Sequence, residues 1–113
     1  MPQAVEAGGW IFVSALFGVS PADRTIPDDA TAEAEQLFDN LEAILAAAGA
    51  RLEHVARVGL VMRDLQGDRP AFNEVWTRRF GGHLPARSAI ESSDFGRPGE
   101  SARYMVEAAA FRG

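Results

Sequence analysis

The pattern of apolar residues at the start of the chain predicts a β-hairpin. Two runs, Ala4 to Ala7 and Gly9 to Ala15, flank the Gly8-Gly9 pair, and the second run is rich in β-branched and aromatic residues. Adjacent glycines favour a tight hairpin turn because both central positions of the turn take positive φ. The Gly, Pro and Asp residues between Phe17 and Pro27 then predict a loop.

Helical periodicity follows this loop. One buried face, spaced i, i+4, i+7 and i+8, consists of Leu37, Leu41, Ile44, Leu45 and Ala48. Asp28, Asp29 and Thr31 are each suited to cap the N-terminus, and Gly49 stands where a left-handed C-terminal residue is needed. These signals predict a long helix.

Val55 to Met62 is apolar at nearly every position, which predicts a central strand covered on both faces. We predict a loop from Asp64 to Asp68, with Asp68 and Pro70 as the cap and first turn of a second helix. The buried face of that helix has the same helical spacing and consists of Phe72, Val75, Trp76, Arg79 and Phe80.

Two strands complete the predicted fold. The first includes Arg87 and runs to about Ser92, a loop covers Ser93 to Glu100, and the last strand runs from Ala102 to Phe111. The resulting order, β-β-α-β-α-β-β, predicts a single α+β domain over residues 1–113, with two helices on one face of a mixed sheet.

The uncovered face of this sheet predicts assembly. The strands carry more apolar positions than one covered face requires, around Phe12, Val58, Leu60 and Met62. Exposed apolar surface of this kind is usually buried by cyclic assembly of subunits. The pattern itself does not choose between two and three subunits.

Composition excludes several function classes. The 113 residues carry a formal charge of −5 with no Lys/Arg-rich run, which argues against a nucleic-acid partner. The lack of cysteine excludes thiol catalysis and cysteine-bound metals, and no metal-site spacing, phosphate loop or dinucleotide fingerprint occurs. His54 and His83 suit surface or capping roles better than catalysis. Neither a basic leader nor a membrane-length apolar run is present, so we expect a cytoplasmic protein without membrane partners.

Arg87 is the strongest candidate for chemistry. It lies within Leu84 to Glu91, where Pro85 fixes the backbone just ahead of a predicted strand. A guanidinium is always charged and presents a planar fork of donors that matches a carboxylate. An arginine held by a rigid turn therefore suits a small organic acid. The alternative is an ordinary surface ion pair.

Glu107 interrupts the apolar last strand, where it shares a face with Met105 and Ala109. On an inner face its carboxylate would need a partner such as Arg57 or Arg87. It would then be placed to act as an acid or base on a water beside Arg87. The alternative, a solvated glutamate, fits the pattern equally well.

Four segments occur together in one known family. They are Pro85-Ala86-Arg87-Ser88 after a helix ending at Phe80, Gln3-Ala4-Val5 before a hairpin strand reading Phe12-Val13-Ser14, Asp39 to Gly49, and Phe72 to Trp76. In this order and spacing, and over nearly the whole chain, the sequence resembles the RidA/YjgF family of imine and enamine deaminases.

The resemblance implies a chorismate-mutase-like α+β fold and a homotrimer with ligand sites in clefts between subunits. Family members hydrolyse reactive 2-imino or enamine acids to 2-keto acids and ammonia, and they need no metal or organic cofactor. By the resemblance, Arg87 clamps the substrate carboxylate, and Ser14 and Asn73 line the pocket. Backbone groups of Ala89 help to hold the ligand, and Glu107 orients the attacking water.

Three features depart from the family pattern. Family members carry a tyrosine just before the segment that matches Gln3-Ala4-Val5, and this position falls at or before Met1, so the tyrosine is absent here. The family's Ser-Gly-Gln at the end of the second hairpin strand is Ser14-Ala15-Leu16 here. The family's last strand commonly carries two glutamates at i and i+2, and the first positions water. Glu107 matches either one, and in the second case Met105 takes the catalytic place. An alternative function is therefore a non-deaminating member that binds small carboxylate metabolites. Ribonuclease activity, a label of some relatives, ranks last because of the negative charge.

Overall fold

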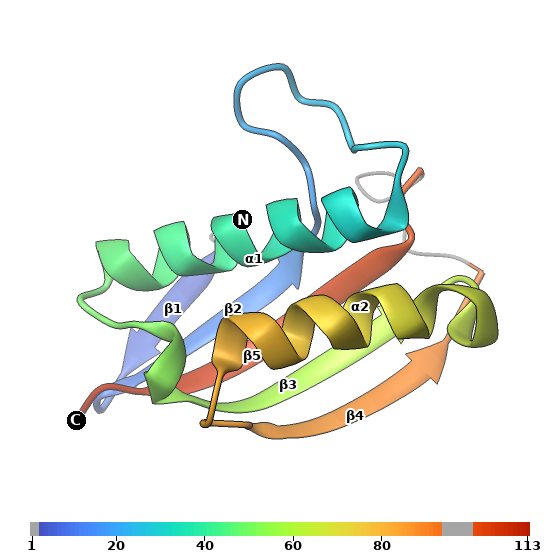
Figure 1. The fold of residues 1–113 in the computed structure, drawn as a ribbon. Helices are drawn as coiled ribbons and strands as arrows, with labels where there is room; N and C mark the ends of the chain where they lie inside the picture. The colour runs from blue at the N-terminus through green and yellow to red at the C-terminus, as the bar shows by residue number, and fades with distance from the viewer. Residues whose placement is uncertain (1–2, 94–100) are drawn as a thin grey trace.

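The computed structural model describes residues 3–93 and 101–113 and has two layers, a sheet and a pair of helices (Figure 1). The helices are α1 (Ala30–Ala47) and α2 (Leu65–Phe80), and a short 3-10 helix spans Leu52–His54. The strands are β1 (Ala4–Ala7), β2 (Trp10–Leu16), β3 (Val55–Met62), β4 (Ala86–Glu91) and β5 (Tyr104–Phe111). The predicted order of helices and strands is confirmed. All of the predicted loop from Ser93 to Glu100 except Ser93 lies outside the described residues.

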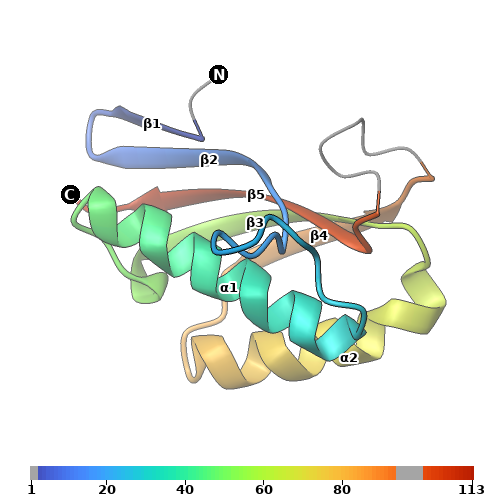
Figure 2. The same cartoon turned by 90° about the horizontal axis from the view of Figure 1, so that it is seen from above.

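The strands form one mixed sheet in the order β1-β2-β5-β3-β4. Strands β3 and β4 are parallel, whereas the other neighbours are antiparallel. Both helices pack against the same face of this sheet, as the view from above shows (Figure 2). Helix α2 leads directly into the edge strand β4, so the strand that carries Arg87 begins next to the helix.

Local signals fix the ends of the hairpin and of α1. Gly8 and Gly9 have φ angles of 58° and 87° and form the turn between β1 and β2. The Asp29 carboxylate caps α1 by accepting the N–H of Ala32 at 2.9 Å. Gly49, with φ of 76°, follows the helix in the left-handed conformation. The predicted hairpin and first helix are therefore confirmed.

The predicted start of the second helix is wrong. Helix α2 begins at Leu65, and its N-cap is Asp64 rather than Asp68. The Asp64 carboxylate accepts the N–H of Gly67 at 3.0 Å, so residues predicted as a loop form the first helical turn. Pro70 lies inside the helix instead of at its start.

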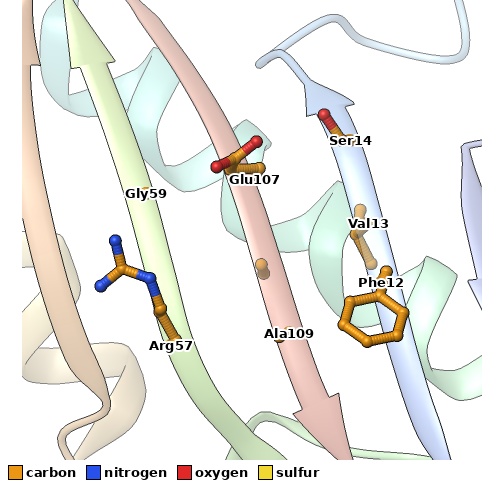
Figure 3. A pocket seen from close by; sticks show the side chains of 8 residues that line it. Phe12, Val13, Ser14, Arg57, Gly59, Glu107 and Ala109 are labelled. Atoms are coloured by element: carbon orange, nitrogen blue, oxygen red, sulfur yellow. The ribbon is translucent and has the colours of Figure 1, made fainter.

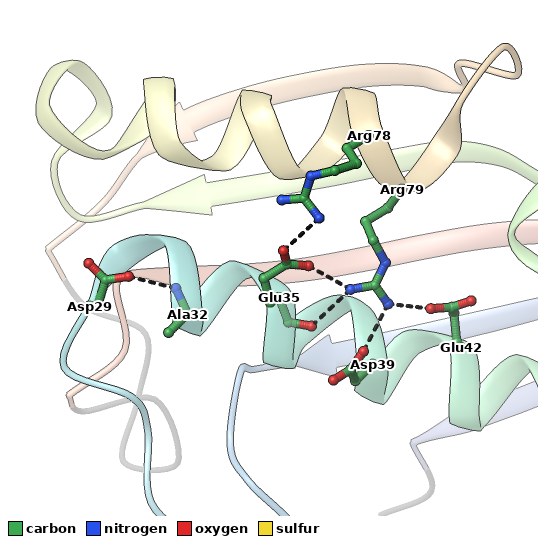
Figure 4. A network of polar contacts seen from close by, with 7 residues as sticks. All are labelled: Asp29, Ala32, Glu35, Asp39, Glu42, Arg78 and Arg79. Carbon is green, nitrogen blue, oxygen red and sulfur yellow. Dashed lines mark hydrogen bonds and ion pairs between the residues drawn. The ribbon is translucent and has the colours of Figure 1, made fainter.

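Arg79 ties the two helices together (Figure 4). Its guanidinium pairs with Glu35 at 2.7 Å and Asp39 at 2.9 Å, and also with Glu42, all on α1. Arg78 pairs with Glu35 as well, at 2.7 Å. An isolated exposed ion pair adds little stability, but a network around one largely buried guanidinium holds two elements in a defined arrangement. The network therefore fixes the position of α2 relative to α1.

One face of the sheet is buried under the helices and the other, which we call the open face, is not covered within one chain. Val58, Leu60 and Met62 are all buried on the helix side, whereas Phe12 is exposed on the open face. The prediction that strand β3 is covered on both faces is wrong, because its fully buried residues all lie on the helix side. The exposed large apolar side chains on the strands are Val5, Trp10, Phe12, Ile90 and Phe111. The open face therefore still carries an apolar patch.

Candidate functional site

Arg87 lies on the helix side of the edge strand. The sheet register pairs it with Val58, which is buried under the helices, and paired residues on neighbouring strands point to the same side. The Arg87 Cζ atom lies 4.9 Å from the ring centroid of Trp76 and 5.8 Å from that of Phe72. These cation–π contacts hold the guanidinium against α2. Pro85, which is buried, anchors the turn before the strand.

The Arg87 guanidinium has no ion-pair partner within residues 3–93 and 101–113. Burial lowers the pKa of Arg87, and the nearby charge of Arg69 lowers this pKa further. The group nevertheless stays charged, because an arginine does not deprotonate in proteins. A partly buried cation without a counter-ion is unfavourable until an anion binds. This geometry differs from the ordinary ion pair and suits an anionic ligand.

Asn73 supplies an unsatisfied polar atom on the same side of α2. It precedes Trp76 by three residues, a spacing that places both side chains on one helix face. The Asn73 Oδ1 atom is buried and accepts no hydrogen bond from any residue that the structure describes. A buried carbonyl oxygen without a donor is costly, so this position fits a ligand that carries an N–H or O–H group.

Ser14 and Glu107 line a pocket of about 210 Å³ on the open face of the sheet (Figure 3). Arg57 and Gly59 of β3 line the same pocket. Gly59 stands opposite Glu107 in the register of β3 and β5, and a Cβ atom at Gly59 would lie 3.0 Å from the Glu107 Cγ. Glycine at this position therefore leaves room for the glutamate side chain, a role that the sequence did not reveal.

The arginine partner that Glu107 would need on an inner face is not observed among the described residues. Arg57 instead donates a hydrogen bond to the Ser88 Oγ at 3.0 Å, and among the described residues no ion pair joins Glu107 to an arginine. Of the two alternatives for Glu107, the solvated glutamate is confirmed, because Glu107 is exposed on the open face, where water can solvate a carboxylate. The predicted common face with Met105 and Ala109 is confirmed.

The predicted site residues fall into two groups on opposite faces of one sheet. We call Arg87 and Asn73 the helix-side half-site, and Ser14 and Glu107 the open-face half-site. A single chain does not bring both groups onto one small ligand, since the sheet itself separates them. Ala89 follows Arg87 at the i+2 position of β4 and packs against the core, on the helix side.

The two histidines take structural roles, as expected from the sequence. The His54 Nδ1 accepts the backbone N–H of Arg51 at 2.9 Å, and the His83 Nε2 lies 2.9 Å from the carbonyl oxygen of Val55. No group of three or more His, Asp or Glu side chains in the described part of the chain could hold a metal ion. The described helices include none that is long and apolar enough to cross a membrane.

Known proteins resemble this chain over almost its whole length. Residues 2–110 match a family model described as Endoribonuclease L-PSP. The 2-iminobutanoate/2-iminopropanoate deaminase of Mus musculus is 32% identical over 112 residues, which cover 98% of this chain and 80% of the mouse protein. The YjgF gene product of E. coli matches with a TM-score of 0.90 and 29% identity, over 100% of this chain and 88% of that one. E. coli TdcF with bound serine matches with a TM-score of 0.90 and 28% identity, over the same shares of the two chains.

Proposed function

Because the chain belongs to the RidA/YjgF family, we propose that it hydrolyses small 2-imino or enamine acids to 2-keto acids and ammonia. The sites are shared between the subunits of a homotrimer. The mouse relative is named for the same reaction on 2-iminobutanoate and 2-iminopropanoate, and TdcF has been crystallised with serine, an amino acid that carries a carboxylate.

The observation that carries this proposal is the uncompensated Arg87 guanidinium beside α2. Its donor fork forms two parallel N–H···O bonds with the substrate carboxylate. The imine N–H of the substrate donates to the buried Asn73 Oδ1. Ala89 lies on an edge strand, so its backbone is accessible for further hydrogen bonds. A 2-imino acid, with an anion next to an N–H donor, matches both unsatisfied groups.

The reaction consumes one water and releases one ammonia. Glu107 accepts a proton from the water while the water oxygen forms a bond to C2 of the C=N group. That proton passes to the nitrogen and gives a carbinolamine with a hydroxyl and an amino group on C2. The hydroxyl proton then moves to the nitrogen through Glu107, the C–N bond breaks, and ammonia leaves as the C=O group of the 2-keto acid forms. An enamine first takes up a proton at C3 and releases one from its nitrogen to become the imine. The Ser14 hydroxyl, in the same open-face pocket as Glu107, holds the water in place.

Assembly joins the two half-sites. Arg87 and Asn73 of one subunit act together with Ser14 and Glu107 of the next subunit. The open-face side chains of Trp10, Phe12 and Phe111, each more than a third exposed in the single chain, supply apolar surface for the contact. The family relationship selects three subunits.

Release of ammonia and pyruvate from 2-aminoacrylate generated in situ tests this function. We expect a rate above that of buffer, since the site supplies a carboxylate clamp and a general base. The mouse deaminase serves as the positive control. No rate above buffer, with the mouse protein active alongside, would show that the chain is not a deaminase of this substrate.

The second candidate is a member that binds small carboxylates without deaminating them. Its basis is the substitution of the family's Ser-Gly-Gln by Ser14-Ala15-Leu16, together with the single glutamate, Glu107, on β5. Met105 and Glu107 both line a neighbouring open-face pocket of about 160 Å³, so either residue fits the place of the family's first glutamate. Keto acids that stabilise the protein against heat without any turnover of the imine would favour this candidate.

Endoribonuclease activity, which the description of the family model names, ranks behind both. The chain has a formal charge of −5, and a polyanion is repelled on average by such a protein. The partly buried guanidinium of Arg87 suits a small anion better than an RNA backbone.

A further inference from the structure

A second arginine, Arg69, lies near Arg87. Because α2 begins at Leu65, Arg69 is part of the helix, and Arg69, Asn73 and Trp76 follow the i, i+4, i+7 spacing of one helix face. Trp76 contacts the Arg87 guanidinium, so this face turns toward β4. Burial is the main reason that the pKa of Arg87 is lowered, and the Arg69 charge is close enough to add to this effect.

Two carboxylates at the start of α2 have other roles. The Asp64 carboxylate caps α2, and the Glu91 carboxylate accepts the first helical N–H at 2.9 Å. The Tyr104 hydroxyl donates to the backbone carbonyl oxygen of Asp68 at 2.8 Å. Burial is the main reason that the pKa of Tyr104 is raised, and the Asp68 carboxylate is close enough to Tyr104 to add to this effect. No ion pair of Arg69 occurs in the described ranges 3–93 and 101–113. In a chain of net charge −5, two neighbouring arginines that form no ion pair with the residues the structure describes make a local site of positive charge.

We propose that the preferred substrate is a 2-imino dicarboxylate, whose 2-carboxylate binds Arg87 and whose side-chain carboxylate binds Arg69. This inference rests on the proposed function, because Arg87 must hold the first carboxylate. Asn73 lies between Arg69 and Trp76 along the helix, so its Oδ1 stays available to the imine N–H between the two anionic groups. A monocarboxylate compensates one guanidinium, whereas a dicarboxylate compensates both. Arg69 therefore selects the class of substrate.

Binding calorimetry with two stable keto acids tests the inference. 2-Oxoglutarate and 2-oxopentanoate have the same chain length and differ in whether the terminal group is a carboxylate or a methyl. We expect wild type to bind 2-oxoglutarate about tenfold more tightly, as one additional charge-assisted hydrogen bond would give. The preference should decrease as ionic strength rises.

Two variants of α2 assign this preference to a residue. Arg69→Gln should remove it, so that the affinity for 2-oxoglutarate falls about tenfold more than the affinity for 2-oxopentanoate. Arg78→Gln is the matched control, since it removes the same charge from an exposed position of the same helix that pairs with Glu35. The control should keep the preference.

The outcomes separate this inference from the proposed function. Equal affinity of wild type for the two keto acids, or a preference that survives in Arg69→Gln, overturns the inference. The proposed function then still stands if Arg87→Gln abolishes binding of both keto acids. If wild type binds neither keto acid, the proposed function fails and the dicarboxylate inference fails with it.

Discussion

Arg87→Gln is expected to lower kcat/KM for imine hydrolysis about a hundredfold or more, because it removes two charge-assisted hydrogen bonds to the substrate carboxylate. Glutamine keeps a polar side chain against Trp76 and Phe72 but carries neither the charge nor the fork. Steady-state ammonia release measures the effect. Saturation by keto acids in calorimetry should be lost in the same variant.

Arg87→Gln should change stability little. The side chain forms no ion pair with the residues that the structure describes, and its ring contacts contribute about 0.5–1 kcal/mol at a partly exposed site. Arg51→Gln is a matched control, because Arg51 pairs with Glu53 at the surface and its side chain is 74% exposed. Wild-type turnover in Arg87→Gln would remove Arg87 from the site, and equal losses in both variants would indicate a general effect of charge.

Arg103→Ala is expected to cause the largest loss of stability. Glu33 on α1 is completely buried, and the Arg103 guanidinium is its counter-ion, with Nη1 donating to the Glu33 Oε1 at 2.9 Å. The backbone N–H of Arg103 also donates to the Glu33 Oε2, at 2.7 Å. Removal of the guanidinium leaves a carboxylate buried without a counter-ion, which costs about 3 kcal/mol. Urea unfolding at equal subunit concentration measures the loss as a lower midpoint with an unchanged slope.

The stability loss in Arg103→Ala should depend on pH. Burial raises the pKa of Glu33, and the hydrogen bonds from Arg103 oppose this rise. Without the guanidinium the pKa rises further. A carboxyl group whose pKa is raised on folding contributes stability at low pH, and this contribution is lost as the pH rises through the folded-state pKa. The difference from wild type should therefore be larger at about pH 8 than at about pH 5.

Glu33→Gln provides the control for this interpretation. In that background no buried charge is left behind, so Arg103→Ala should cost much less than it does with Glu33 present. A stability loss that is the same at both pH values and in both backgrounds would mean that Arg103 acts through packing rather than through the buried carboxylate.

The sequence predicted the parts of the fold that depend on local signals. The Gly8-Gly9 turn, the cap region at Asp29 and the left-handed Gly49 each act within a few residues, and the structure has all three. The start of α2 was mispredicted because Asp64 and Asp68 are both suited to an N-cap, and Pro70 favoured the later one. The contact with Gly67 that decides between them is visible only in three dimensions.

The arrangement of the candidate site depends on strand pairing, which local patterns do not encode. Alternation along β5 predicted which residues share a face with Glu107, but not which side of the sheet that face is on. The register that pairs Arg87 with Val58 and Glu107 with Gly59 places the two charged residues on opposite faces. Arg69 was missed because the misplaced start of α2 assigned it to the first turn. Its i+4 spacing to Asn73 was the available signal.

The central claim is that each site takes Arg87 from one subunit and Glu107 from the next, and co-refolding two inactive variants tests it most directly. In a random mixture of Arg87→Gln and Glu107→Gln subunits, a site is intact only when a Glu107→Gln subunit supplies its Arg87 and an Arg87→Gln subunit supplies its Glu107. About a quarter of the sites meet this condition at equal mixing in a cyclic trimer. We therefore predict recovery of about a quarter of wild-type activity in particles that light scattering identifies as trimers. A mixture that stays inactive, while refolded wild type regains its activity, would contradict the shared site.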